Sequence, residues 1–361
     1  MLEAVVSELS DKSAHKLTLV TENESGARRY ELSCTEDETI YEAARAKGFR
    51  LPVSCLNGVC HVCRANLRSG SVLSGTSKKL ISHQSEELSS TEIMLCQAWP
   101  KGKSEIEVRH LFGPGELPVK KLKCQVLSVK RLKGHVFQVD FQLPAGKQPE
   151  FFPGQYLALQ LPGKEGVSYF SIASRPGLRV LSLHIQADPH LFSAMDVISY
   201  LESCVAQGFL AALSLPYGEA CLTTIPNKPL VLVAAGTGFS QMKSIIEHLF
   251  EHQFSSPISL YWGVRKEEDM YLQDLAESWA QEHENFKFMP LISDIEDIEL
   301  TDHHNQLSDA VLAEDEKLLE SMVFVSGSPK LVFSAMDAFM GVGLPENQFF
   351  SDVLAYAVRE G

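Results

Sequence analysis

Long apolar runs are missing from this chain of 361 residues. No stretch approaches the roughly 18–20 apolar residues that a membrane-spanning helix needs, so we expect no membrane span. Residues 1–8 (MLEAVVSE) also lack the basic segment and the following apolar segment of a secretory signal peptide. The absence of both signals predicts a cytoplasmic protein.

Positive charge is also scarce. The chain has 32 Lys and Arg against 46 Asp and Glu, a formal net charge of −14, and the acidic excess lies almost entirely after residue 230. Proteins that bind nucleic acid neutralise its phosphates with basic patches, so this balance predicts no nucleic-acid partner. No P-loop, Ser–His–Asp set or paired-carboxylate site stands out in the sequence.

Four of the eight cysteines stand at an informative spacing. Cys55, Cys60 and Cys63 form C-x4-C-x2-C, and Cys96 follows after a longer gap. This is the ligand pattern of a plant-type [2Fe–2S] cluster, in which two thiolates serve each iron. Gly58 gives the loop a backbone freedom that a Cβ would remove. The pattern predicts a centre that accepts and passes single electrons.

A zinc site is the alternative. Structural zinc usually takes its ligands from two short knuckles, whereas here three cysteines share one loop and the fourth stands alone. The spacing therefore favours the iron–sulfur cluster. The other cysteines lie in apolar surroundings and indicate reduced thiols, as in a cytoplasm. They are Cys34, Cys124, Cys204 and Cys221.

Residues 15–110 resemble plant-type ferredoxin domains. A strand at residues 15–20 and a helix at 38–48 precede the cysteine loop, and Cys96 lies in a short apolar run that indicates a returning strand. The resemblance implies an α+β fold of the β-grasp type. His61 stands where the family often carries glycine, and it either donates a hydrogen bond to cluster sulfur or points to solvent.

A barrel is expected after the linker at residues 111–118, which holds two Gly and two Pro. Six short β-like segments follow, interrupted by a helix-like stretch at about 192–204. They lie at residues 121–129, 136–143, 155–161, 169–173, 179–186 and 211–215. Short strands at this spacing, separated by turn signals, predict a small β-barrel.

From residue 229 the pattern alternates between strands and helices. Strands are expected at 230–234, 258–262, 286–292 and 322–325, and helices at 238–252, 270–280 and 330–340. The alternation predicts a parallel, doubly wound sheet. Gly236 and Gly238 stand between the first strand and helix, where they let the backbone approach a dinucleotide diphosphate at a helix N-terminus.

The chain from residue 119 to its end resembles the ferredoxin–NADP reductase superfamily. The segments that carry the resemblance are 151–156 (FFPGQY), 170–174 (FSIAS), 216–219 (PYGE), 262–265 (WGVR), 269–271 (DMY), 325–329 (VSGSP) and 350–352 (FSD). The resemblance implies a flavin (FAD, or else FMN or riboflavin) and NADH or NADPH. The last 240 residues are also similar to the bacterial NAD(P)H:flavin reductases, which use flavin as a diffusing substrate.

The resemblance assigns residues to roles by position. The candidate catalytic residues are Ser171, near the flavin N5, and Ser326, in the hydride-transfer gap. The candidate cofactor-binding residues are Phe170, Ser171, Ile172, Ala173, Ser174, His184, Gly218, Gly236, Thr237, Gly238 and Gly327. Two departures count: Ser168 replaces the arginine that clamps the flavin diphosphate, and Ser326 replaces a cysteine found in several relatives.

We predict three domains: a [2Fe–2S] ferredoxin domain at 1–112, a flavin-binding barrel at 119–226 and an NAD(P)H-binding domain at 227–361. The predicted enzyme is an NAD(P)H-dependent oxidoreductase that passes electrons through flavin and cluster to an acceptor protein. This layout resembles the reductase components of bacterial multicomponent oxygenases and the iron–sulfur reductase of CDP-glucoseen-type deoxysugar synthesis. The alternatives are a free-flavin reductase with an attached cluster and a non-catalytic redox sensor or relay. The acidic last third favours NADH.

Overall fold

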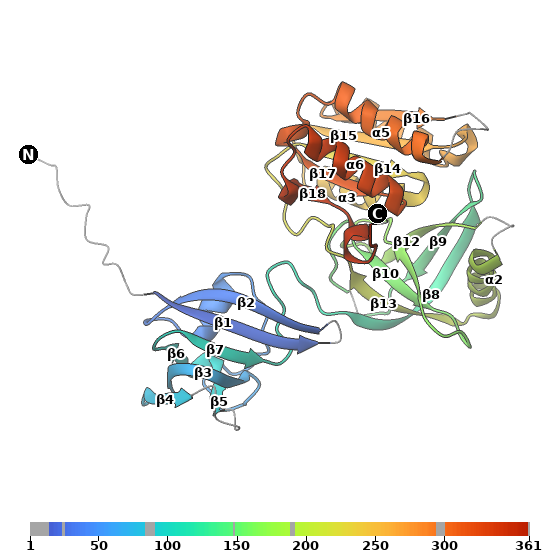
Figure 1. Cartoon of the computed structure of the whole chain (residues 1–361). Coiled ribbons are helices and arrows are strands. Elements are labelled where there is room, and N and C mark those ends of the chain that lie inside the picture. The colour runs from blue at the N-terminus through green and yellow to red at the C-terminus, as the bar shows by residue number, and fades with distance from the viewer. Residues whose placement is uncertain are drawn as a thin grey trace, which may run out of the picture. The chain divides into compact units, whose positions relative to one another are not determined.

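The computed structural model describes residues 14–23, 26–83, 91–146, 149–187, 192–293 and 300–359. The chain divides into two compact units, Met1–Pro118 and Val119–Gly361 (Figure 1). Each unit is built around hydrophobic cores of its own. Within the described ranges, no helix is long and apolar enough to cross a membrane.

A mixed sheet with one helix packed on it forms the first unit. Its elements are β1 (Ala14–Asn23), β2 (Gly26–Thr35), α1 (Ile40–Ala46), β3 (Arg64–Ser74), β4 (Lys79–His83), β5 (Thr91–Met94), the 3-10 turn η1 (Leu95–Gln97), β6 (Ala98–Pro100) and β7 (Ser104–Val108). The strands run in the order β2-β1-β7-β3-β4, with β5 and β6 also paired to β3. β1 is antiparallel to β2 and parallel to β7, which confirms the predicted α+β fold.

Helix α1 is set in place by its start signal. The Thr39 hydroxyl accepts from the Glu42 backbone N–H at 3.2 Å, and the Glu42 carboxylate accepts from the Thr39 N–H at 2.9 Å. This reciprocal capping box satisfies two donors that a helix start leaves free. The helix then buries Ile40, Ala43 and Ala44. Its packing against η1 brings it next to the segment that carries Cys96.

A six-stranded barrel opens the second unit. Its elements are β8 (Lys120–Arg131), β9 (Val136–Gln142), β10 (Tyr156–Gln160), β11 (Ser168–Ser171), β12 (Val180–Gln186), α2 (Phe192–Gln207) and β13 (Leu210–Tyr217). The strands run in the order β11-β10-β13-β8-β9-β12, and a bridge between Ile172 and Leu183 joins the two ends. Alternate residues fill the interior, as on β9, where Val139 and Phe141 have exposed fractions of 0%. The barrel prediction is confirmed.

A parallel sheet of five strands completes the second unit. Its strands are β14 (Leu230–Ala235), β15 (Ile258–Val264), β16 (Phe286–Ile292), β17 (Met322–Ser326) and β18 (Phe349–Phe350), in the order β16-β15-β14-β17-β18. The helices are α3 (Phe239–Glu251), α4 (Gln273–Glu282), α5 (Leu300–Glu314) and α6 (Pro329–Gly341). Short 3-10 turns are η2 (Gly236–Gly238), η3 (Glu267–Asp269), η4 (Leu318–Glu320), η5 (Glu346–Gln348) and η6 (Asp352–Ala355).

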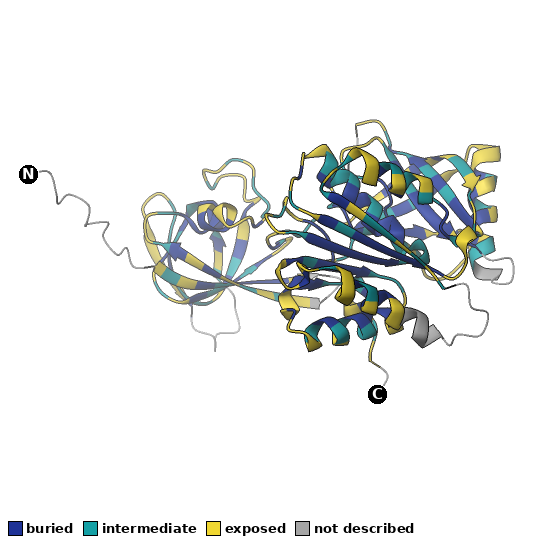
Figure 2. Cartoon of the chain, turned by 90° about the horizontal axis from the view of Figure 1, so that it is seen from above, coloured by how far each residue is buried: buried dark blue, intermediate teal, exposed yellow. Residues whose placement is uncertain are grey.

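Helices cover both faces of this sheet. Leu232 and Ala234 of β14 pack with α3 and α4, whereas Val231 and Val233 pack with α5 and α6. The central strands are therefore buried throughout (Figure 2). Strands buried on both faces show continuous apolar runs rather than alternation, which is why β14 was visible in the sequence. The doubly wound prediction is confirmed.

Two details differ from the sequence prediction. The expected strand at Cys96 is wrong, because β5 ends at Met94 and Cys96 lies in η1. This turn carries the thiol toward the cysteine loop, since the Leu95 N–H bonds the Cys63 carbonyl at 3.1 Å. α5 and β18 were not predicted: α5 has a mixed polar sequence, and β18 has only two residues.

Candidate active site and iron–sulfur loop

The iron–sulfur loop lies between α1 and β3. Its cysteines come together as two pairs. Cys63 and Cys96 are buried, with exposed fractions of 2% and 4%, and their Sγ atoms lie 3.2 Å apart. Cys55 and Cys60 lie on the more exposed side, where the Cys60 backbone N–H is 3.3 Å from Cys55 Sγ.

The loop backbone turns sharply at three places. Gly58 has φ +82°, and the non-glycine residues Leu56 and His61 have φ +60° and +57°. Left-handed conformations cost non-glycine residues roughly 1–2 kcal/mol, so the surroundings must hold this shape. The Gln97 side chain helps, because its amide donates to the Leu56 carbonyl at 3.2 Å. His61 is more than half exposed, as the solvent-facing alternative predicted.

Two pairs of thiols suit a two-iron cluster better than a single ion. No group of three His, Cys, Asp or Glu side chains surrounds one ion position within the described residues. A hydrogen bond from the Cys60 side chain, aided by loop N–H groups, lowers the pKa of Cys55 to about 6. Burial, with the neighbouring Cys63 thiol, raises the pKa of Cys96 to about 12. Four cysteine sulfurs arranged as two neighbouring pairs fit [2Fe–2S], whose irons each take two thiolates.

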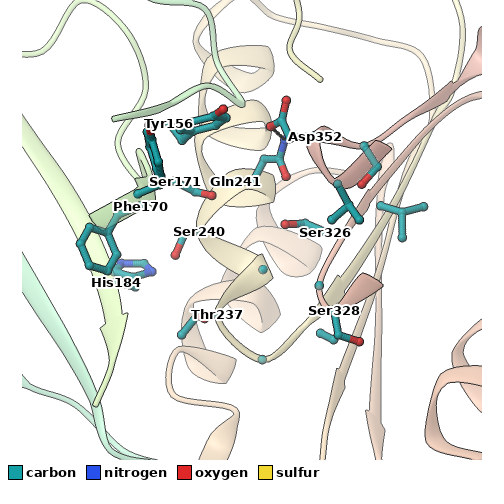
Figure 3. A pocket seen from close by; sticks show the side chains of 18 of the residues that line it. Tyr156, Phe170, Ser171, His184, Thr237, Ser240, Gln241, Ser326, Ser328 and Asp352 are labelled. Atoms are coloured by element: carbon teal, nitrogen blue, oxygen red, sulfur yellow. Dashed lines mark hydrogen bonds between the residues drawn. The ribbon is translucent and has the colours of Figure 1, made fainter. Parts of the chain in front are cut away.

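A cavity of about 970 Å³ lies in the second unit, lined by both the barrel and the parallel sheet (Figure 3). From the barrel come Tyr156, Phe170 and His184. From the carboxyl ends of the sheet strands come the turn after β14 and Ser326 at the end of β17. The carboxyl edge is where open parallel sheets bind their ligands.

The cavity brings together most of the residues predicted from the sequence. Those that line it are Phe170, Ser171, His184, Gly236, Thr237, Gly238, Ser326 and Gly327. The others lie outside its lining: Ile172, Ala173, Ser174 and Gly218. The Ile172 and Ala173 side chains are fully buried, and the Ser174 carbonyl accepts from the Ser244 hydroxyl of α3 at 2.9 Å. These three residues therefore pack beside the cavity-lining residues Phe170 and Ser171 rather than facing the cavity.

The two glycines of the β14–α3 turn stand at their positions for different structural reasons. Gly236 has φ +51°, and a Cβ there would meet nothing closer than 3.9 Å, so its side faces open space. A Cβ on Gly238 would lie 2.3 Å from the Ser326 carbonyl oxygen. Gly238 is thus required by close packing against β17. The Trp262 indole N–H donates to the Gly236 carbonyl at 2.9 Å and holds the turn.

Asp352 closes one side of the cavity. Its Oδ1 accepts from the backbone N–H groups of Glu219 and Ala220 at 2.9 and 3.0 Å. The Gln241 amide of α3 donates to the Ala220 carbonyl at 2.9 Å. These contacts tie the chain end, the turn after β13 and α3 together. Burial raises the pKa of Asp352.

Sequence reasoning gave no role to several lining residues. They are Tyr156, Ser240, Gln241, Ser351 and Asp352. The signals were partly present, since Tyr156 ends the FFPGQY segment and Asp352 ends the FSD segment. The buried hydroxyl of Ser351 has no partner within the described residues, whereas that of Ser240 lies close enough to the Tyr271 hydroxyl to lower its pKa. Buried polar groups normally have a partner, so the Ser351 hydroxyl fits a polar ligand in the cavity.

The four-cysteine loop on a β-grasp sheet, and the barrel that shares a cavity with a doubly wound sheet, define an iron–sulfur flavin reductase. Protein-family models match both parts. Residues 21–101 match the 2Fe-2S iron-sulfur cluster binding domain. Residues 232–336 match the oxidoreductase NAD-binding domain.

Known proteins are similar to this chain. Reductase component 1 of terephthalate 1,2-dioxygenase from Comamonas sp is 29% identical over 324 residues, which cover 89% of this chain and 94% of that protein. The NAD(P)H-flavin reductase of Aliivibrio fischeri is 30% identical, over 65% of this chain and 99% of that protein. The solved cytochrome P450 reductase GcoB of Amycolatopsis shares the fold, with a TM-score of 0.58 at 23% identity over 93% of this chain and 98% of that one.

The chain therefore belongs to the family of the NAD(P)H-flavin reductases, with a 2Fe-2S domain preceding the reductase part. It is an NAD(P)H-dependent oxidoreductase whose cofactors are a [2Fe–2S] cluster, a flavin and NAD(P)H. Electrons pass from NAD(P)H through the flavin to the cluster. The predicted enzyme class is confirmed.

Proposed function

We propose that the cavity of the second unit is the hydride-transfer site, and that Cys55, Cys60, Cys63 and Cys96 hold the cluster. One observation carries the assignment of the cavity. The flavin-strand residues Phe170 and Ser171 line the same space as the Gly236–Gly238 turn, although more than sixty residues separate them in the chain. This supports a site where two cofactors meet.

A bound flavin accepts the two electrons of a hydride and releases them singly, which a one-electron cluster requires. Phe170 offers an apolar ring, against which a flat heterocycle packs. Ser171 and Ser326 bring hydroxyls from opposite walls of the cavity (Figure 3). We assign Ser171 to hydrogen bonding at the flavin and Ser326 to orienting the nicotinamide.

The dinucleotide is held mainly by the backbone in this proposal. The Gly236–Gly238 turn runs directly into α3, and the Phe239 N–H bonds the Gly236 carbonyl, so the N–H groups left for a phosphate are those of the turn, which lines the cavity. A helix N-terminus attracts phosphate through these donors and its dipole. Among the described residues, no lysine or arginine lines the cavity. We infer that NADH is preferred, because a 2′-phosphate requires basic side chains.

The acceptor in this proposal is a protein partner of the oxygenase or deoxysugar dehydratase type. The relative from Comamonas is the reductase component of a dioxygenase, which supports the first type. We also propose a cytoplasmic location, supported by the buried free thiols of Cys34, Cys124 and Cys204. We also propose the domain limits 119–226 and 227–361, which the separate six-stranded and five-stranded sheets of the second unit support.

An anaerobic titration of the purified protein tests the proposal. NADH is added stepwise while flavin absorbance, cluster absorbance and bound iron are measured. We expect both chromophores to bleach in wild type, and only the flavin to bleach in Cys96→Ser. NADPH is the matched titrant and should be needed at higher concentration. A protein that contains iron but binds no flavin at saturating supply would falsify the proposal.

A second candidate, the free-flavin reductase, is favoured by the missing cations. Ser168 replaces the clamp arginine, and the cavity offers no lysine or arginine from the described residues. Without such partners a flavin diphosphate gains little affinity over an uncharged flavin. This candidate predicts that riboflavin, FMN and FAD bind within a few-fold of one another and that activity requires added flavin. An FAD that remains bound through gel filtration would rule it out.

A further inference from the structure

Tyr271 and His184 connect the two walls of the cavity. His184 lies on β12 of the barrel, and Tyr271 lies between η3 and α4 beside the parallel sheet. The Tyr271 hydroxyl oxygen is 3.0 Å from His184 Nδ1, and the two rings meet edge to face with centroids 5.2 Å apart. His184 lines the cavity next to Phe170 (Figure 3).

Tyr271 is held rigidly. Its exposed fraction is 5%, and its ring packs edge-on against Trp262 at 5.3 Å and Phe239 at 6.1 Å. Trp262 is itself the donor to the Gly236 carbonyl. A continuous set of contacts therefore runs from the dinucleotide turn through Trp262 and Tyr271 to His184.

Burial keeps both members of this pair uncharged. Burial raises the pKa of Tyr271 far above its usual value, so the phenol keeps its proton. Burial, with a smaller effect from Lys243, lowers the pKa of His184 to about 3, so the imidazole is neutral. A neutral imidazole has one donor and one acceptor nitrogen. If the phenol donates to Nδ1 across the 3.0 Å contact, the imidazole proton resides on Nε2.

His184 Nε2 has no hydrogen-bond partner among the described residues, although the ring lines the cavity. We propose that Tyr271 fixes His184 as an uncharged Nε2–H donor that binds an acceptor oxygen of the cofactor in this cavity. His184 is then a binding residue, and Tyr271 is a positioning residue. This inference rests on the proposed function of the cavity. Flavin and nicotinamide dinucleotide both carry such oxygens, and the test separates them.

The surroundings keep this donor uncharged. Lys243 on α3 disfavours a proton on the second nitrogen, and its own ammonium is paired with Glu247 at 2.6 Å. Asp140 on β9 acts in the opposite direction with a smaller effect. The donor therefore stays constant at neutral and mildly acidic pH.

The first test reads the tautomer directly, without any cofactor. Long-range 15N–1H spectra of full-length protein labelled at histidine are compared with those of His184→Gln, which identifies the His184 signal. We expect the pattern of a neutral Nε2–H imidazole from pH 8 to pH 5.5, and a mixed pattern in Tyr271→Phe. An Nδ1–H pattern, or an imidazolium at pH 6, overturns the proposal. Should His184→Gln not fold, the signal that changes in Tyr271→Phe identifies His184.

The second test measures binding in two arms. The Kd for riboflavin and FAD comes from fluorescence quenching, and the KM for NADH from steady-state rates. Tyr271→Phe should raise one of them about two- to tenfold, the range of a lost neutral hydrogen bond, with kcat less affected. The constant that rises, the Kd for flavin or the KM for NADH, identifies the cofactor that carries the acceptor oxygen.

A matched control separates this effect from loss of packing. Tyr261→Phe removes another buried tyrosine hydroxyl of the second unit, one outside the cavity lining, and should change neither arm. Values of Kd and KM within twofold of wild type in Tyr271→Phe and His184→Gln overturn the proposal. A protein that shows the expected tautomer and binding but reduces no flavin refutes the proposed function alone.

Discussion

Gly238→Ala tests the close packing of the Gly236–Gly238 turn against β17. The new Cβ would lie 2.3 Å from the Ser326 carbonyl oxygen and 2.8 Å from its carbonyl carbon. These are backbone atoms, so either α3 or the end of β17 must move. Overpacking of this kind costs about 1–3 kcal/mol. In a unit of this size, each kcal/mol lowers the Tm by about 2–4 °C, so we expect a drop of about 2–12 °C.

The assay combines thermal unfolding with NADH kinetics. The shift moves Ser326, which lines the cavity, so the KM for NADH should rise along with the loss of stability. Gly341→Ala is the matched control, because a Cβ there meets nothing within 4 Å. That variant should be neutral or more stable by about 0.4–1 kcal/mol, since alanine restricts the unfolded chain. Equal Tm values for both variants would refute the reasoning.

Three further predictions concern other contacts of the site. Trp262→Phe removes the donor to the Gly236 carbonyl and should cost about 1–3 kcal/mol, with a several-fold higher KM for NADH; an unchanged KM would contradict it. Cys96→Ser should lose its iron in a metal assay, while Cys204→Ala, far from the loop in sequence, should keep it. Burial places the folded pKa of Asp352 above its unfolded value, so the stability that its protonated form contributes is lost as pH rises through the folded pKa. Asp352→Asn should therefore gain stability relative to wild type between pH 4 and pH 7 in denaturant unfolding, and parallel pH profiles would argue against this.

The predictable parts of this molecule depend on local spacing. The C-x4-C-x2-C loop, the continuous apolar run of β14 and the Gly236–Gly238 turn each occupy a few neighbouring residues. Such patterns express backbone geometry directly, as a period or a fixed offset. They were enough to predict the three folds and to nominate eight of the lining residues.

The parts that sequence could not predict depend on contacts between distant segments. Asp352 binds the N–H of Glu219 across 133 residues, and Tyr271 reaches His184 across 87. Each contact joins the barrel to the parallel sheet or its chain end. Their partners become visible only when the two sheets are placed together, because neither residue lies in a pattern that names the other.

The edge position of β11 has a consequence for how the enzyme tolerates change. Within the described residues, β11 pairs with β10 on one side, and only Ile172, just beyond its end, bridges to the other. An edge strand leaves every second amide and carbonyl without a strand neighbour. A planar heterocycle lying along that edge can be bound by main-chain groups, and side-chain substitutions other than proline leave these groups in place. In that case, serine in place of arginine at position 168 would leave the binding of the ring unchanged. It would weaken only the binding of the group attached to the ring.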